Sequence, residues 1–329
     1  MLTFRSDCLR EIRAFFHERG YLETDTPALA SSLIPETCLE VFKTSYLRPA
    51  WSASRSDSDA DRELYLVPSP EVYLKRIIAD HGVSLFQLSK CYRNVESTGN
   101  IHSPEFTMLE YYTIGFDYRA SLTLTCELIT RLCTTVSGAR SVPVSFTEIT
   151  MDEAFAQAAG FPLSSCPESR DLAYHAERLG LGNHCDYESW AWDDLYELLL
   201  VHTVEPWLSS FDAVFLCDYP ARVPCLASER GTGWKTKDRW ELYMGGVEIA
   251  NCYSEERNAE AVNRYMSEEQ SLKDTTALVP HRVIENFGAV CARMPPCSGV
   301  AAGIDRLIMR LAGKKTIDAV LPFPLTDRL

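Results

Sequence analysis

RNVESTGNIHSPEFTMLE, residues 93–110, is the stretch that decides the fold of this 329-residue chain. β-forming runs lie on both sides of a connection that has the Ser, Thr, Gly, Asn and Pro content of a long hairpin loop. Side chains alternate faces along a strand, so one face of the second strand collects Phe106, Met108, Glu110 and Tyr112. The stretch predicts two antiparallel strands, residues 84–93 and 105–112, with an aromatic ring, a carboxylate and a phenol on one face.

Arg93 ends the first strand, close enough across the hairpin for its guanidinium to reach that face. A guanidinium offers a planar, bidentate grip on phosphate oxygens. On this segment alone, however, a solvated strand with a surface Arg/Glu pair is the better interpretation. His102 has no acid–base partner nearby in sequence, so we expect it to make a polar contact, which in this loop includes contact with phosphate.

A second hairpin is predicted over residues 240–253, where Gly245 and Gly246 supply the positive φ values of a tight turn. Unbroken pairing outward from the turn places Glu241 opposite Ala250 and diagonal to Glu248 on the same face. Two neighbouring carboxylates favour a cation between them, and Mg²⁺ is commonly held by one or two carboxylates together with substrate phosphates. Two exposed acids on a solvent face are an equally good interpretation of this segment.

Asn251, Tyr253 and Glu255 have the opposite strand parity to Glu248. A regular strand would therefore send them to the other face, and only a β-bulge would bring them back beside Glu248.

A third candidate is the small-residue run SGVAAGIDRL, residues 298–307. It predicts a strand that leads into a helix, with Arg306 in the first helical turn, where an anion can bind. Close packing of a helix on a sheet, with a surface Arg, explains the same pattern.

The charge balance, and several motifs that the sequence lacks, argue against some classes of function. The chain carries 32 basic and 46 acidic residues, a net charge of −14, so no strong positive field gathers nucleic acid. No GxxxxGK[ST] loop and no GxGxxG motif is present, which leaves P-loop and Rossmann nucleotide sites unsupported. No run of about 20 apolar residues could span a membrane, and the twelve cysteines form no CxxC pair, so we expect a cytoplasmic protein with free thiols.

Helical spacing predicts an opening helix over residues 4–19, and Ser69 followed by Pro70 predicts a helix with Ser69 as its N-cap. The Ser- and Asp-rich residues 48–62 read as a mobile loop between strands. Residues 117–212 are mainly helical in pattern, which indicates a helical insertion. Further expected elements are a strand over residues 213–219, a helix over 256–273, and a strand and helix over 299–311.

Together these segments resemble the signature motifs of class II aminoacyl-tRNA synthetases. Residues 20–27 (GYLETDTP) resemble motif 1, residues 93–110 motif 2 and residues 303–306 (GIDR) motif 3. The lysyl branch is the nearer match, through residues 69–76 (SPEVYLKR) and 246–251 (GVEIAN). Because the motif 1 helix begins within the first few residues, the resemblance narrows to the elongation factor P–(R)-β-lysine ligase family, which lacks the N-terminal anticodon-binding OB domain.

The resemblance implies an α+β class II synthetase catalytic fold in one domain, residues 1–329: an antiparallel β-sheet flanked by helices, with motif 1 forming a homodimer interface. It also implies an adenylate-forming ligase that uses ATP and Mg²⁺, activates (R)-β-lysine or lysine, and transfers it to a lysine of elongation factor P. A tRNA partner is not expected, and neither is a membrane.

The resemblance further assigns site residues, with Arg93 and Arg306 as the catalytic pair on the α- and γ-phosphates. The implied ATP-binding residues are Arg93, Asn94, Glu96, His102, Ser103, Phe106, Glu248, Ile249, Gly303 and Arg306. The implied amino-acid pocket consists of Ser69, Glu71, Glu110, Tyr112, Asn251, Tyr253, Glu255 and Ala301, and the implied Mg²⁺ ligands are Glu241 and Glu248.

Some positions depart from the lysyl pattern. Ala301 replaces a glycine, and one methyl group on a pocket wall changes substrate choice by about 1–3 kcal/mol. Val95 lengthens the motif 2 loop and Ser103 replaces an asparagine, which puts the ATP contacts of Glu96 and Ser103 in doubt. A truncated lysyl-tRNA synthetase-like enzyme that acts on tRNA and a paralogue that only binds an amino acid stay open as alternatives.

Overall fold

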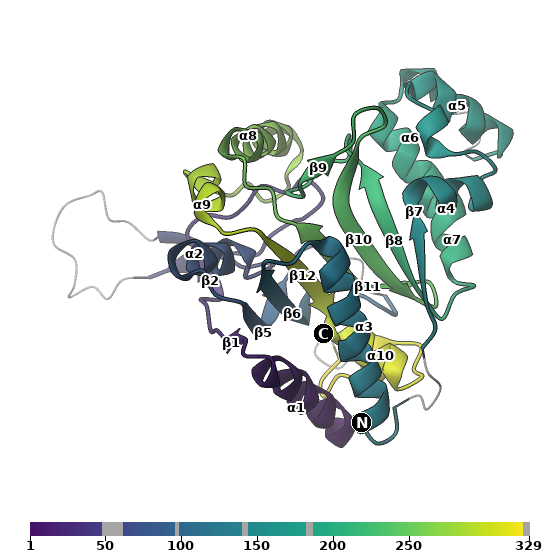
Figure 1. Ribbon diagram of the computed structural model, residues 1–329. Coiled ribbons are helices and arrows are strands. Elements are labelled where there is room, and N and C mark those ends of the chain that lie inside the picture. The colour runs from purple at the N-terminus through teal and green to yellow at the C-terminus, as the bar shows by residue number, and fades with distance from the viewer. Residues whose placement is uncertain (48–61, 96–98, 140–143, 182–186, 325–329) are drawn as a thin grey trace, which may run out of the picture.

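A computed structural model describes residues 1–47, 62–95, 99–139, 144–181 and 187–324. A nine-stranded sheet forms its centre, with strand order β1-β5-β6-β12-β11-β10-β8-β7 and with β9 paired to β10 (Figure 1). In that order the strands are β1 (Leu22–Glu23), β5 (Leu85–Tyr92), β6 (Glu105–Ile114), β12 (Cys297–Gly303), β11 (Val247–Ser254), β10 (Thr236–Met244), β8 (Ala213–Pro220), β7 (Phe146–Thr150) and β9 (Glu229–Arg230).

The six strands from β5 to β8 pair antiparallel, as predicted, but the sheet as a whole is mixed. β1 pairs parallel with β5, and β7 pairs parallel with β8. Parallel neighbours need a long crossover connection, and the chain between β7 and β8 supplies one as a series of helices. A smaller sheet contains β2 (Leu29–Ala30), β4 (Arg62–Leu66) and β3 (Lys43–Tyr46). The predicted loop joins β3 to β4, and its residues 48–61 lie outside the described residues.

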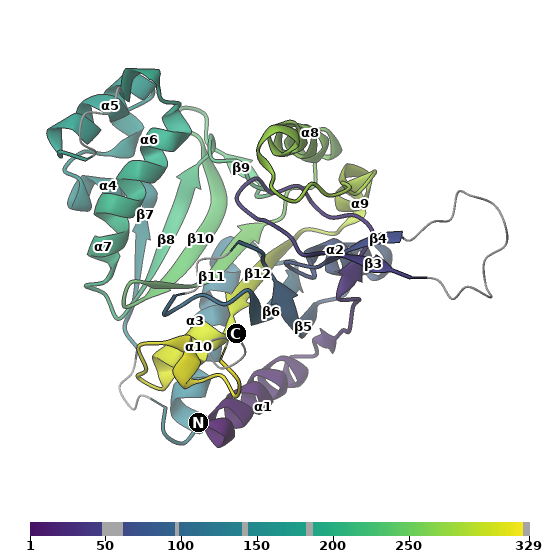
Figure 2. The same ribbon diagram turned by 180° about the vertical axis from the view of Figure 1, so that it is seen from behind.

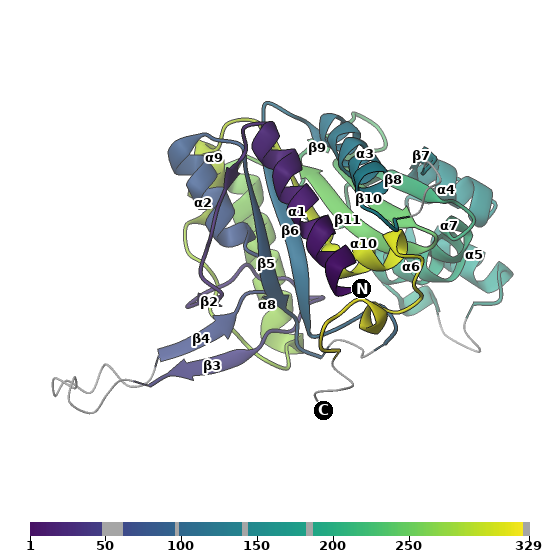
Figure 3. The same ribbon diagram turned by 90° about the horizontal axis from the view of Figure 1, so that it is seen from below.

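Three helices cover one face of the large sheet: α1 (Leu2–Glu18), α3 (Tyr118–Thr135) and α10 (Ile304–Leu311), as Figure 3 shows. The largest apolar core lies beneath them. Phe16 of α1 stacks on Phe86 of β5 with ring centroids 4.9 Å apart and touches Tyr111 of β6 at 4.8 Å. Thr107, Leu109 and Tyr111 therefore face this core, which leaves the even-numbered side chains of β6 for the opposite face.

On the opposite face, α2 (Glu71–His81), α8 (Ala259–Thr276) and α9 (Phe287–Arg293) form a second layer beside β5 and β6. α2 begins one residue later than predicted, because Pro70 rather than Ser69 occupies the cap position. The Ser69 hydroxyl still accepts a hydrogen bond from the Glu71 amide at 3.0 Å. Gly82 ends the helix in the left-handed conformation, with φ 62°. α9 had no counterpart among the predicted elements.

The predicted helical insertion starts later than residue 117. α3 packs in the main core, whereas the helices that follow β7 share a core of their own with β8. These helices gather on the β7 side of the sheet (Figure 2). They are α4 (Met151–Ala158), α5 (Ser169–Arg178), α6 (Trp192–Leu199) and α7 (Glu205–Leu208). The prediction also missed β7, a five-residue edge strand whose pairing depends on the distant β8.

A buried ion pair ties the two ends of the chain together. Arg5 of α1 lies 2.7 Å from Asp305 of α10 and donates to the Thr107 hydroxyl at 2.9 Å. Asp305 also accepts the Thr107 amide at 2.7 Å. These contacts hold the start of α10, and with it Arg306, against the middle of β6.

We predict that Arg5→Met lowers the free energy of unfolding by about 3–5 kcal/mol, because it leaves the Asp305 carboxylate buried without its cation. The control is Arg10→Met on the same helix, since Arg10 pairs with Asp7 at an exposed position and should change stability by less than about 0.5 kcal/mol. Urea denaturation of the two variants measures both values. Equal stabilities would show that the Arg5–Asp305 pair does not hold α10 in place.

Candidate active site

Two adjoining pockets open on the face of β6, β12 and β11 that lies away from α1. They share Arg93, Met108, Asn251 and Ala301, which form the boundary between them. One pocket extends toward α10 and the chain before β6, and the other toward α2 and the loop between β2 and β3. Arg93, predicted to reach the functional face of the first hairpin, therefore lies where the two pockets meet.

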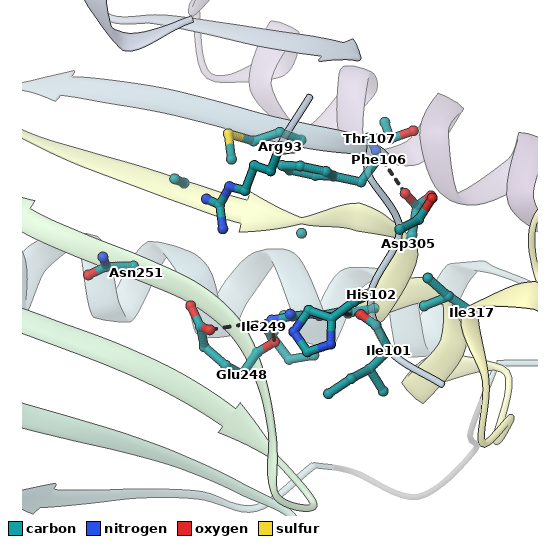
Figure 4. Close-up of a pocket in the computed structure, with 15 residues that line it drawn as sticks. Arg93, Ile101, His102, Phe106, Thr107, Glu248, Ile249, Asn251, Asp305 and Ile317 are labelled. Atoms are coloured by element: carbon teal, nitrogen blue, oxygen red, sulfur yellow. Dashed lines mark hydrogen bonds and ion pairs between the residues drawn. The ribbon is translucent and has the colours of Figure 1, made fainter. Parts of the chain in front are cut away.

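The first pocket combines an aromatic ring with two guanidinium groups. The Arg93 guanidinium carbon lies 5.2 Å from the centroid of the Phe106 ring. Figure 4 shows Arg93 and Phe106 on one side of the cavity, with Ile101, His102 and Glu248 on the other. Predicted residues that line this pocket are Arg93, His102, Ser103, Phe106, Glu248, Ile249, Gly303 and Arg306. A flat ring beside two cations suits a nucleotide, whose base stacks and whose phosphates need positive charge.

Arg306 is held in position by acceptors on two segments. Its Nε donates to the Ile101 carbonyl at 3.0 Å, and its Nη1 donates to the Glu248 carbonyl at 3.1 Å and lies 3.3 Å from the Glu248 carboxylate. Asp305, its neighbour, lines the same pocket and forms the buried ion pair with Arg5. At the start of α10, Asp305 is thus paired with a cation of the protein, whereas Arg306 offers a cation to the pocket.

The second hairpin contains the β-bulge that would bring Asn251 beside Glu248. Gly245 and Gly246 both have positive φ, 53° and 78°, as the predicted turn requires. Tyr243 pairs with Glu248, but the register then shifts, so that Glu241 pairs with Asn251. The expectation that Glu241 faces Ala250 is wrong, because Ile249 is the extra residue on β11. Through this bulge Glu248 and Asn251 both line the first pocket.

Glu241 is buried next to the pocket rather than exposed in it. It forms an ion pair with Arg239 and accepts a hydrogen bond from the Tyr243 hydroxyl at 2.8 Å. Burial opposes its charge, but Arg239 and the hydrogen bonds from Tyr219 and Tyr243 together outweigh burial and lower the pKa of the Glu241 carboxyl. Burial and the negative Glu241 raise the pKa of Glu248. A cation placed between them would relieve this repulsion, so the pair suits Mg²⁺ held jointly with phosphates. Within the described residues, no group of three or more possible metal-binding side chains exists.

The second pocket is dominated by acids. Glu36, Glu71, Glu110 and Glu255 line it, together with Ser69, Tyr112, Asn251, Tyr253 and Ala301. Lys75 of α2 lies beneath it, 1% exposed, and bridges Glu71 at 2.5 Å and Glu255 at 2.7 Å. The Ser69 hydroxyl donates to Glu110 at 2.6 Å. Four carboxylates thus face two cations, Lys75 beneath the pocket and Arg93 at its boundary, so acids are in excess.

Two buried acceptors in this pocket lack a donor. Within the described part of the chain, the Oε2 atom of Glu110 and the Oδ1 atom of Asn251 have no hydrogen-bond partner. An unpaired buried acceptor costs about 1–3 kcal/mol, so both atoms favour a ligand that brings N–H groups. Burial, with Glu71 nearby, raises the pKa of Glu110 to about 8 and that of Glu36 to about 7. Burial also raises the pKa of Glu255 to about 7, against the lowering effect of Lys75.

Some predicted site residues lie elsewhere. The Asn94 side chain donates to the Val41 carbonyl at 3.3 Å and accepts from the Val95 amide at 2.9 Å, so it shapes the loop and does not line the first pocket. Val95, the extra loop residue, has φ 58°, which is an unfavourable value for a β-branched side chain. Glu96 lies outside the described residues.

Sequence reasoning missed Glu36, Lys75 and Asp305. Lys75 stands in the quoted SPEVYLKR segment, four residues after Glu71, a spacing at which a helix pairs opposite charges. No sequence pattern pointed to Glu36. Its loop is held over the pocket by α8, which lies more than 230 residues away in the sequence. The eleven cysteines among the described residues are all free, as predicted.

Comparisons with known proteins agree with this geometry. A family model described as tRNA synthetases class II (D, K and N) matches residues 1–327. Three relatives are each named elongation factor P–(R)-β-lysine ligase. The protein of Vibrio cholerae is 35% identical over 98% of this chain and 94% of its own length, that of Hamiltonella defensa 32% over 98% and 94%, and that of Photorhabdus laumondii 32% over 99% and 95%.

The chain belongs to the elongation factor P–(R)-β-lysine ligase family of class II synthetases. The family predicted from the motifs is thereby confirmed, as are the class II fold and the assignment as an ATP-dependent ligase. Among the described residues, no helix of this ligase-family chain is long and apolar enough to cross a membrane.

We predict that a diamino acid binds this ligase-family pocket more weakly as the pH falls from 8 to 6. An ammonium ligand requires ionised carboxylates, and protons bound by Glu36, Glu110 and Glu255 below pH 7–8 must leave first. Calorimetry at pH 7 in buffers of different ionisation enthalpy should therefore detect protons released on binding. Affinity that is constant from pH 6 to 8, with no proton release, would contradict this electrostatic description.

Substitution of one glycine in each pocket tests whether the two pockets bind different substrates. A Cβ atom at Gly299 would lie 2.4 Å from Glu255 Oε1 and 2.4 Å from Tyr112 Cε1, whereas one at Gly303 would meet nothing closer than 3.8 Å. Gly299→Ala should therefore raise the KM for the amino acid roughly tenfold or more. Gly303→Ala, which projects a methyl group into the first pocket, should raise the KM for ATP instead. Steady-state kinetics distinguishes the two, and identical profiles would contradict the assignment of separate pockets.

Proposed function

We propose that this enzyme uses ATP to activate (R)-β-lysine, or lysine, as an aminoacyl-adenylate and transfers the aminoacyl group to a lysine side chain of elongation factor P. The observation that carries the proposal is the junction at Arg93: a pocket with an aromatic ring and two guanidinium groups meets one with four carboxylates and two unpaired buried acceptors. The first suits ATP, and the second suits a substrate with two ammonium groups. The names of the relatives supply the acceptor protein.

In the first step, an oxygen of the amino-acid carboxylate attacks the α-phosphorus of ATP, and pyrophosphate leaves. Arg93, shared by both pockets, is placed to hold the α-phosphate against the incoming carboxylate, and Phe106 provides a stacking surface for adenine. Arg306 would leave its present acceptors for the γ-phosphate, because a phosphate is a stronger partner than a carbonyl. The enzyme needs no nucleophile of its own.

Glu248 and Glu241 would hold Mg²⁺, which supplies positive charge to the phosphates as charge develops on them. Their mutual repulsion supports this assignment, and the ion pair of Glu241 with Arg239 leaves Glu248 as the carboxylate that lines the pocket. In the second step, a neutral amine of the acceptor lysine attacks the adenylate carbonyl, an amide forms, and AMP leaves.

The side chains of the acidic pocket are assigned to the amino-acid substrate. Glu71, Glu110 and Glu255 would receive the ammonium groups, with Asn251, Ser69, Tyr112 and Tyr253 completing the walls. Ala301 places its methyl group at the boundary between the pockets, where a change of shape affects the reacting end of the substrate. The homodimer and the cytoplasmic location stay predictions.

The test is amino-acid-dependent ATP–pyrophosphate exchange with lysine and with (R)-β-lysine, followed by transfer of labelled amino acid to elongation factor P or to lysine tRNA. We expect exchange that prefers (R)-β-lysine and label on the protein. Arg93→Met and Arg306→Met should each lower kcat by about 10² or more, whereas the exposed Arg10→Met should not. Label on tRNA would favour the synthetase alternative, and absence of exchange with any amino acid would favour a paralogue that only binds.

A further inference from the structure

The loop between β2 and β3 contributes one acid, Glu36, to the amino-acid pocket. Its place in the pocket differs from that of the deeper acids. The loop that carries Glu36 pairs with the segment after Arg93 through Glu40 and Asn94, whereas Glu255 lies 2.7 Å from Lys75, and Glu110 accepts a hydrogen bond from Ser69, next to α2. Glu36 therefore lies at the Arg93 end of the pocket, and Glu110 and Glu255 lie at the Lys75 end.

The loop is fastened by buried side chains of α8. Lys273, 4% exposed, donates to the Glu36 carbonyl at 2.8 Å and also to the Leu39 carbonyl. Glu269, 6% exposed, accepts the Thr37 amide at 2.8 Å and the Thr37 hydroxyl at 3.0 Å. Both contacts flank Glu36, so its backbone position is set by a helix more than 230 residues away in sequence.

A third anchor joins the loop to the nucleotide side. The Glu40 carboxylate accepts the amides of Leu278 at 2.9 Å and Val279 at 3.0 Å, and the Glu40 carbonyl accepts the Asn94 amide at 2.8 Å. Asn94 directly follows Arg93. The segment that carries Glu36 is thus hydrogen-bonded to Asn94, the residue after Arg93, which we propose binds the α-phosphate.

The backbone at Glu36 and Thr37 is hydrogen-bonded to α8, but the Glu36 carboxylate has no partner among the described residues. Within the described residues it accepts no hydrogen bond and forms no ion pair, unlike Glu71, Glu110 and Glu255, which each have a partner. The buried Oε2 of Glu110 in the same pocket also lacks a donor. The half-buried Glu36 carboxylate is therefore available to a cationic ligand in a pocket with an excess of acids.

The reacting carboxylate of the substrate must approach the α-phosphate, so it lies at the shared boundary beside Arg93. The amine nearest that carboxylate then lies at the Arg93 end of the pocket, and the terminal amine extends toward Lys75. We propose that Glu36 determines specificity by binding the ammonium group nearest the substrate carboxylate, while Glu110 and Glu255 bind the terminal ammonium group. This assignment rests on the proposed function.

The test combines a protein substitution with truncated ligands. Glu36→Gln and the unmodified enzyme are titrated in a calorimeter with (R)-β-lysine, with 3-aminohexanoate, which lacks the terminal amine, and with 6-aminohexanoate, which lacks the proximal one. We expect Glu36→Gln to raise the Kd roughly tenfold or more for the first two ligands, and to leave the Kd of 6-aminohexanoate unchanged within about twofold. The same pattern is expected in the KM values of ATP–pyrophosphate exchange.

Glu40→Gln is the matched control. It loosens the same loop without changing the charge at Glu36, so it should weaken all three ligands by a similar factor. If Glu36→Gln also weakens 6-aminohexanoate equally, or weakens none of the ligands, the assignment is overturned while diamino-acid activation by the unmodified enzyme still supports the proposed function. Failure of the unmodified enzyme to bind any diamino acid would overturn both.

Discussion

One extra residue in β11, Ile249, is the constraint on which the arrangement of the site depends. In a regular antiparallel pair, Glu248 and Asn251 would point to opposite faces of the sheet, because side chains alternate strictly. The bulge shifts the register against β10, so Glu248 reaches the first pocket and Asn251 reaches the boundary with the acidic pocket. Beyond the bulge, Tyr253 shares the parity of Asn251 and lines the acidic pocket. Without that residue, Glu248 and Asn251 would not both line the first pocket.

Like charges dominate the acidic pocket, and the fold accepts their repulsion in the absence of substrate. Lys75 offsets part of it from below, and burial together with the neighbouring Glu71 raises the pKa values of Glu36, Glu110 and Glu255. If this pocket binds the amino acid, as proposed above, a substrate with two ammonium groups would convert this repulsion into binding energy, which a substrate with no side-chain ammonium group would do less well. We therefore expect the excess of acids to favour diamino acids as a class.

The start of α10 carries two adjacent charged residues with different partners. Arg5, Thr107 and Asp305 form a buried polar cluster that fixes this end of the helix. The next residue, Arg306, bridges Ile101 and Glu248 at the first pocket. If Arg306 exchanges these partners for phosphate, as proposed above, we expect the Arg5–Asp305 pair to keep the helix that carries it in place.

The sequence by itself determined the features that depend on local periodicity and turn chemistry: the hairpin that places Phe106 and Glu110 on one face, the two-glycine turn before Glu248, and the strand-to-helix junction at Arg306. Those segments also sufficed to identify the family. Only the tertiary structure decided which residue forms the bulge, that β1 and β7 pair parallel at the edges, and that Glu36 lines the acidic pocket with Lys75 beneath it. These features arise from contacts between segments far apart in the chain. Lys75 meets Glu255, and Glu269 and Lys273 hold the Glu36 loop, through packing that leaves no periodic signal in either segment.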